Sequence, residues 1–108
     1  MGDRRTVRGV GARPDRGRPR SFLEWSSLRR WGKLPETERD RPGYLLRLAR
    51  VDAGLTQAQL AERVGITQQA VSRAERWSSN PTVGLMRRWL AACGRRLRLD
   101  VVPSADGA

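Results

Sequence analysis

Polar side chains that can hydrogen-bond to the edges of nucleobases are concentrated in one short stretch of this sequence, TQQAVSRAER, residues 67–76. Glutamine offers an amide that both donates and accepts, and the guanidinium of arginine donates two parallel hydrogen bonds. Glutamine thereby matches N6 and N7 of adenine, and arginine matches O6 and N7 of guanine. The candidate base-reading residues are Gln68, Gln69, Ser72 and Arg73.

Small apolar residues in the same stretch predict that these polar side chains share one side of a helix. Ala70, Val71 and Ala74 recur at spacings of one, three and four, which is typical of the inner face of a helix. The opposite, polar face then has the shape and chemistry needed to enter a major groove about 12 Å wide. A polar face that is only solvated is the alternative interpretation.

The charge of the chain favours a polyanionic partner. The 108 residues include 22 Lys+Arg against 11 Asp+Glu, a net charge of +11, and Lys33 is the only lysine. The planar guanidinium suits bidentate contact with phosphate or with a guanine edge better than an ammonium does. Double-stranded DNA is therefore the expected partner.

Other classes of protein are disfavoured by what the sequence lacks. Without histidine, and with Cys93 as the only cysteine, it has no Cys/His zinc site, no disulfide and no imidazole base. We therefore predict no enzyme activity, no metal and no cofactor. No apolar run approaches the ~20 residues that span a bilayer, so no membrane partner is expected. The expected location is cytoplasmic and nucleoid-associated, with a transit peptide over residues 1–20 as the weaker alternative.

Four helices over residues 43–94 are predicted to position the polar stretch. A T-x-x-Q capping box at Thr56 opens the second helix, and Gly65 supplies the left-handed residue of the turn that follows it. Thr67 and Thr82 can cap the third and fourth helices. The residues assigned to inner faces are Leu46, Ala49, Ala53, Leu60, Ala61, Val64, Ala70, Val71, Ala74, Leu85, Met86, Trp89, Leu90 and Cys93.

The stretch LTQAQLAERVGITQQAVSRAER, residues 55–76, resembles the lambda-repressor/Cro-like family, also called XRE. The preceding R-x-x-x-G-L-T-Q and the later N-P-T, residues 80–82, fit its flanks. The resemblance covers residues 43–94 and implies an all-α, four-helix, helix-turn-helix domain that binds DNA. It also implies that the glutamines after Thr67 read bases.

The resemblance carries further expectations about the end of the third helix. It implies that Arg50 and Glu75 meet as a partly buried salt bridge; two separate surface charges are the alternative. Trp77 stands where the family usually has glycine in a left-handed C-cap, a conformation that costs a tryptophan about 1–2 kcal/mol unless the loop 77–81 takes another path. Ala74 replaces a larger aliphatic residue and leaves a hole that Trp77 or Trp89 can fill.

Phosphate contacts are expected on both sides of the third helix. Helix N-termini have free backbone N–H groups and the positive end of the helix dipole, which favour an anion. Gln57 stands at the start of the second helix, and other polar residues follow the third helix. The candidate phosphate-binding residues are Gln57, Thr67, Arg76, Ser78, Ser79 and Asn80.

The end of the sequence changes from helical to alternating periodicity. RRLRLDVV predicts a strand within residues 95–103, with Leu97, Leu99 and Val101 on one face, followed by a tail over residues 104–108. A lone strand leaves its backbone groups unpaired, so we expect the same strand of a second copy to pair with it, antiparallel, in a homodimer. Four helices followed by such a strand resemble the antitoxin members of the family, of the HipB and HigA types.

The first 42 residues are predicted to form an arm and a helix. Residues 1–20 contain seven arginines and few aliphatic residues, so we expect a disordered basic arm that either contacts DNA or remains solvated. Residues 21–42 begin with an S-x-x-E capping box, form an amphipathic helix and end in a charged linker. The apolar face of this helix either packs within the chain or binds a partner such as a toxin, and its residues are Phe22, Trp25, Leu28 and Trp31.

Two functions therefore remain open. The first is a sequence-specific transcriptional regulator, in particular a repressor that binds an inverted repeat as a homodimer. The alternative is the antitoxin of a toxin–antitoxin pair, which neutralises a toxin by binding it and regulates its own operon.

Overall fold

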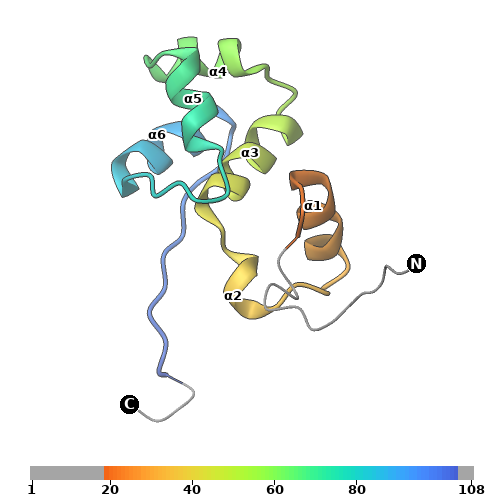
Figure 1. Cartoon of the computed structure of the whole chain (residues 1–108). Helices are drawn as coiled ribbons and strands as arrows, with labels where there is room; N and C mark the ends of the chain where they lie inside the picture. The colour runs from red at the N-terminus through yellow and green to blue at the C-terminus, as the bar shows by residue number, and fades with distance from the viewer. Residues whose placement is uncertain (1–18, 105–108) are drawn as a thin grey trace, which may run out of the picture. The chain divides into compact units, whose positions relative to one another are not determined.

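The computed structural model describes residues 19–104, apart from the side chains of Glu36 and Thr37, and this range is mostly helical. The described chain divides after residue 41 into two compact units, and each unit is described by itself. Almost all of the predicted basic arm falls outside the described residues. The helices, in chain order, are α1 (Phe22–Arg30), α2 (Glu36–Arg39), α3 (Pro42–Asp52), α4 (Gln57–Val64), α5 (Gln68–Ala74) and α6 (Val83–Ala92) (Figure 1).

Side-chain caps fix the ends of the helices in the second unit. The Thr56 hydroxyl accepts from Gln59 N (3.0 Å) and the Gln59 side chain accepts from Thr56 N (2.9 Å), which completes the predicted capping box of α4. Gly65 follows α4 with φ of 84°, a conformation that glycine adopts without a steric penalty. Thr67 caps α5 and Thr82 caps α6, each accepting a backbone N–H at 3.0 Å.

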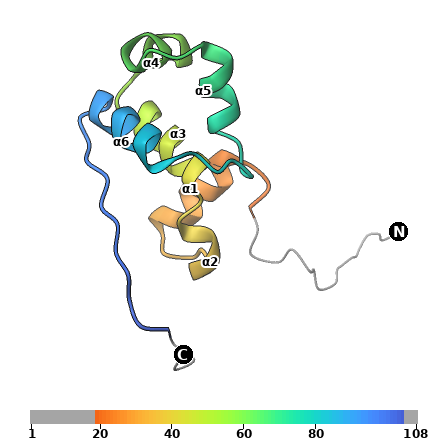
Figure 2. The same ribbon diagram turned by 90° about the vertical axis from the view of Figure 1, so that its left-hand side faces the viewer.

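The four helices of this unit enclose one apolar core. Leu46 of α3, Leu60 of α4, Val71 of α5 and Trp89 of α6 are all fully buried. α4 contacts both α5 and α6, and α6 contacts α3 (Figure 2). The Trp89 indole N–H donates to the Leu46 carbonyl at 3.0 Å, which also satisfies the one polar atom of this side chain. Ala53, which we predicted to face inward, follows the end of α3 and is exposed.

The loop after α5 packs closely against the start of α3. Trp77 meets Tyr44 edge to face, with ring centroids 5.4 Å apart. A Cβ atom on Gly43 would overlap the carbonyl oxygen of Arg76, so only glycine permits this approach. α5 itself ends on Glu75 with φ of −87°, and its C-cap is therefore not left-handed. Trp77 thus packs on an aromatic ring of α3, while Trp89 lies in the core.

The first unit has a small apolar cluster of its own. Phe22 stacks on Trp25, with centroids 6.0 Å apart, and the Trp25 indole N–H donates to the Glu38 carbonyl at 2.8 Å. Residues 34–42, which the sequence predicted as a charged linker, contain a buried Leu34 and the single helical turn of α2. Pro35 precedes that turn with φ of −58°, a value that its ring fixes and that suits entry into a helix.

The predicted C-terminal strand is not formed within the single chain. Residues 95–104 contain no strand and no helix, and Leu99 and Val101 are 62% and 96% exposed. The physical reason is that a strand needs a neighbour to satisfy its backbone, and residues 19–94 are helices and short connections that offer no extended edge. The prediction of an all-α helical domain is thus confirmed, whereas the strand and its pairing are not seen.

Candidate nucleic-acid interface

Helix α5 has two sharply different sides. Val71 is fully buried in the core, and Ala70 and Ala74 beside it are half-buried. The predicted base-reading side chains are all exposed on the other side, namely Gln68, Gln69, Ser72 and Arg73. The polar side of α5 is therefore open to a macromolecular partner.

A depression brings three of these side chains together with one residue of α4. Its volume is about 450 Å³, and it is lined by Gln57, Gln68, Gln69 and Ser72. Three of the four lining residues are glutamines, whose amides donate as well as accept hydrogen bonds. Arg73 does not line the depression, although it is exposed on the same helix.

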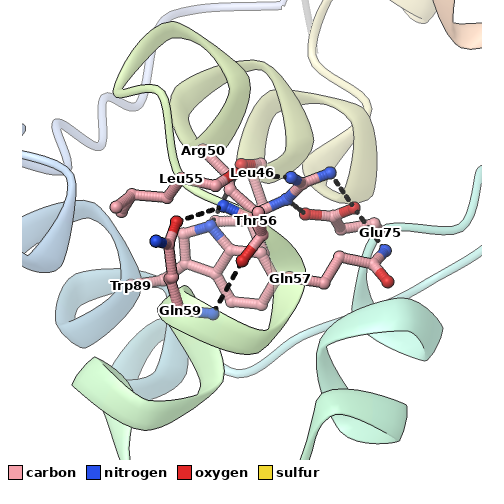
Figure 3. Close-up of polar contacts among 8 residues, drawn as sticks. All are labelled: Leu46, Arg50, Leu55, Thr56, Gln57, Gln59, Glu75 and Trp89. Carbon is pink, nitrogen blue, oxygen red and sulfur yellow. Dashed lines mark hydrogen bonds and ion pairs between the residues drawn. The ribbon is translucent and has the colours of Figure 1, made fainter.

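Gln57 also belongs to a polar network that joins three helices (Figure 3). Arg50 of α3 pairs with the Glu75 carboxylate through Nε (2.5 Å) and Nη2 (3.1 Å), and donates to the Leu55 carbonyl at 2.8 Å. Glu75 is only 4% exposed. Its Oε1 also accepts from the side-chain amide of Gln57, at 3.1 Å. Two groups of opposite charge therefore hold the end of α5 against α3, and the same carboxylate fixes the first residue of α4.

This network changes the role open to Gln57. We predicted Gln57 as a phosphate contact, and in the structure its side-chain NH₂ group donates one hydrogen bond to the Glu75 carboxylate. Gln57 also lines the depression, and its backbone N–H belongs to the first turn of α4, where N–H groups have no partner within the helix. The sequence did not reveal that Glu75 positions Gln57, because nothing in a separation of 18 residues signals that contact.

The other predicted phosphate-binding residues divide into two groups. The Thr67 hydroxyl accepts from Ala70 N, and the Ser79 hydroxyl donates to the Ala74 carbonyl at 2.6 Å, so both take part in the ends of α5. The side chains of the remaining three are exposed along the segment that leaves α5, and they are Arg76, Ser78 and Asn80.

Cys93 lies outside this face, at the C-cap of α6, where it is half-buried. Burial raises the pKa of its thiol above the ordinary value of 9.0, and the positive charges of Arg50, Arg63 and Arg95 partly oppose this rise. A thiol with a raised pKa is a poor nucleophile, which suits a packing role.

The residues predicted for partner contacts are partly hidden. Phe22 and Trp25 are buried and Leu28 is half-buried, whereas Trp31 is 71% exposed. At the other end of the described chain, Leu97 is half-buried, and Leu99 and Val101 are exposed.

Residues 19–104 contain neither a metal-binding cluster nor a helix that could span a membrane. No group of three acidic, histidine or cysteine side chains in this range is arranged to hold a metal ion. The described helices include none with the length and apolarity needed to cross a membrane.

Comparison with known proteins agrees with the geometry of α4 and α5. Residues 46–99 match the family model described as Helix-turn-helix. The chain is 40% identical over 65 residues, 59% of this chain and 94% of the relative, to a protein of Methanothermobacter thermautotrophicus named as an uncharacterized HTH-type transcriptional regulator. No solved structure matches. The chain therefore belongs to the XRE-type helix-turn-helix family.

Proposed function

We propose that this protein is a sequence-specific DNA-binding transcriptional regulator that places α5 in the major groove. One observation carries the proposal: α5 seals the core with Val71 while its opposite side exposes Gln68, Gln69 and Arg73. A helix with a buried apolar face and an exposed face of these residue types fits the major groove and can form bidentate pairs with adenine and guanine. The name of the archaeal relative supports the same role in transcription.

Phosphate contacts in this proposal flank α5. The backbone N–H groups at the start of α4 face one strand, with Gln57 held in place by Glu75. Arg76, Ser78 and Asn80 face the other strand. The net charge of +11 adds a sequence-independent attraction, so the affinity falls steeply with salt.

The regulator acts as a homodimeric repressor on an inverted repeat. The exposure of Leu99 and Val101, 62% and 96%, supports a second copy at the C-terminal segment. Two copies related by a two-fold axis present two α5 helices to half-sites spaced about one helical turn apart.

Selection from random double-stranded DNA, followed by titration of variants on the selected site, tests the assignment. Gln68→Ala and Arg73→Ala should each lose about 1–3 kcal/mol of discrimination at defined base pairs while retaining non-specific binding. Arg88→Ala, which removes an exposed charge from α6, is the matched control and should keep the sequence preference. Unchanged preference in both α5 variants would refute base reading by this helix.

A second candidate function is that of an antitoxin, as in the HipB and HigA types. The observation in its favour is that the first unit exposes two large apolar side chains, Leu23 and Trp31, which are 76% and 71% exposed. A co-transcribed toxin gene would support this function. Co-expression of that toxin with the chain, with and without residues 21–34, tests whether the tryptophan helix neutralises it; equal rescue by both forms excludes this helix.

A further inference from the structure

The segment after α6 carries its charges in a polarised order. Arg95, Arg96 and Arg98 come first, and Asp100 is the next charged residue along the segment. The apolar residues Leu97, Leu99 and Val101 alternate with Arg98 and Asp100, and Leu99 and Val101 are largely exposed. A second copy of the segment in antiparallel orientation therefore sets the acidic end of one copy against the basic end of the other. Parallel pairing would set like charges together.

Only some registers of such a pair bring the apolar faces together. Residues directly opposite each other in an antiparallel pair point to the same face of the sheet. The apolar residues of both copies therefore share one face only if opposite residues are an even number of positions apart in the sequence. This requires that the two-fold axis pass through a residue and not between two residues. An axis at Arg98 puts the two Arg98 side chains opposite each other, and an axis at Asp100 does the same with two carboxylates. Like charges directly opposite each other are destabilising. An axis at Leu99 avoids both conflicts.

We propose that the C-terminal segments of two copies pair antiparallel about an axis at Leu99. Leu99 then faces the partner's Leu99, Leu97 faces the partner's Val101, and Arg98 faces the partner's Asp100. Each dimer gains two cross-strand ion pairs and a continuous apolar row. This register rests on the homodimer proposed above and specifies how the two copies meet. Pro103 falls opposite the partner's Arg95, at the end of the ladder, where its missing N–H does least harm.

A cavity beside the segment fits this register. It has a volume of about 280 Å³ and is lined by Arg87, Ala91, Arg95, Arg96 and Leu97. Because Leu97 faces the partner's Val101, that valine lies over the apolar part of the cavity. A side chain that is 96% exposed in the single chain thereby finds an apolar neighbour. The cavity is formed by α6 and the segment, separately from the depression at Gln57 and Gln68.

Single cysteines map the axis directly. In a Cys93→Ala background, Leu99→Cys, Arg98→Cys and Asp100→Cys are oxidised and the covalent dimers are separated without reductant. Opposite residues have Cα atoms about 4.5–5.5 Å apart, within disulfide range, whereas diagonal neighbours are about 7–8 Å apart. We expect Leu99→Cys to cross-link at least about tenfold faster than the other two. A maximum at Arg98→Cys or Asp100→Cys would move the axis and overturn this register.

Charge reversal provides an independent readout, because it needs no cysteine. Arg98→Asp and Asp100→Arg should each weaken the dimer about tenfold, since each converts two ion pairs into two repulsions. Together they should restore the dissociation constant to within about threefold of the original. Combining Arg96→Asp with Asp100→Arg is the control, because that pair faces across the axis only if the axis lies at Arg98. Rescue by the control pair alone would contradict the proposal.

Sedimentation of the unmodified protein distinguishes a failure of the proposed register from a failure of the proposed homodimer. A dimer without cross-linking at residue 99 overturns the register and leaves the homodimer intact. A monomer at every concentration tested overturns both. Circular dichroism and thermal melting of each variant verify that the helices remain folded.

Discussion

The helical part of the second unit, residues 42–94, and the segment that follows it, residues 95–104, both carry a regular apolar pattern. The helical part satisfies its pattern within one chain, because Leu46, Leu60, Val71 and Trp89 are fully buried together. The segment does not bury its apolar residues within the single chain, because Leu99 and Val101 remain largely exposed. A periodic sequence therefore predicts what a segment can bury, but not whether its partner lies in the same chain.

The contributions of the two regions to stability should depend differently on protein concentration. Interactions within residues 42–94 contribute to unfolding in the same way at every protein concentration. In the proposed homodimer, interactions of residues 95–104 with a second copy would contribute only as mass action allows, so their effect would grow with concentration.

Glu75→Ala should cause the largest loss of stability, and it acts within the helical region, residues 42–94. The substitution removes the carboxylate that pairs with Arg50 and accepts from Gln57, and it leaves a guanidinium whose side chain is only 11% exposed without its counter-charge. We expect a loss of about 3–5 kcal/mol in the free energy of unfolding, measured by chemical denaturation. Glu62→Ala, at an exposed position of α4, should change it by less than about 0.5 kcal/mol. Equal effects would show that the network does not stabilise the fold.

Two leucine truncations compare the regions directly. Leu60→Ala empties a fully buried position and should cost about 2–5 kcal/mol at every protein concentration. Leu99→Ala should leave the stability of the dilute monomer nearly unchanged and should lower the melting temperature only where dimers form. Melting curves over a wide range of concentrations measure both effects. A concentration-independent loss in Leu99→Ala would place this residue in the core of its own chain.

Thr67→Ala removes the cap of α5 and should cost about 1 kcal/mol. Because α5 is only seven residues long, its first turn should fray, and amide hydrogen exchange should accelerate there. Thr82→Ala removes the equivalent cap of α6 and is the matched control. Both variants should lose similar stability, but only Thr67→Ala should weaken DNA binding. If both variants lost DNA binding equally, the cap of α5 would have no special role at the interface.

The smallest effect is expected at Cys93. Its pKa is raised by burial, so the folded protein holds the thiol proton more tightly than the unfolded chain does. The stability from this group is present below pH 9.0 and is lost as the pH rises through the folded value. Relative to Cys93→Ala, the protein should therefore lose stability above that pH. Iodoacetamide should modify the native thiol more slowly than the unfolded one; equal rates would mean that the thiol is exposed.

Local signals explain how much of the helical region the sequence predicted. Each cap of α4, α5 and α6 depends on residues within three positions of each other, such as Thr56 with Gln59. The left-handed turn needs a glycine at one position, Gly65, and the apolar spacing of each helix identifies its buried face. Such short-range features can be read from a single sequence.

Contacts between distant residues explain what the sequence missed. The bond from Gln57 to Glu75 and the edge-to-face contact of Tyr44 with Trp77 join residues on different elements. The turn of α2 depends in part on Trp25, whose indole needs the Glu38 carbonyl. No pattern of spacing encodes such contacts, because they arise only when the helices have packed.

Changing single DNA atoms tests whether the exposed side of α5 reads bases in the major groove. Replacing adenine or guanine in the selected site by its 7-deaza analogue removes the N7 acceptor of the major groove and leaves the minor groove unaltered. The account predicts about a tenfold or greater loss of affinity at the positions assigned to Gln68, Gln69 or Arg73, and no further loss when the matching side chain is already alanine. Full affinity for the 7-deaza sites would contradict it.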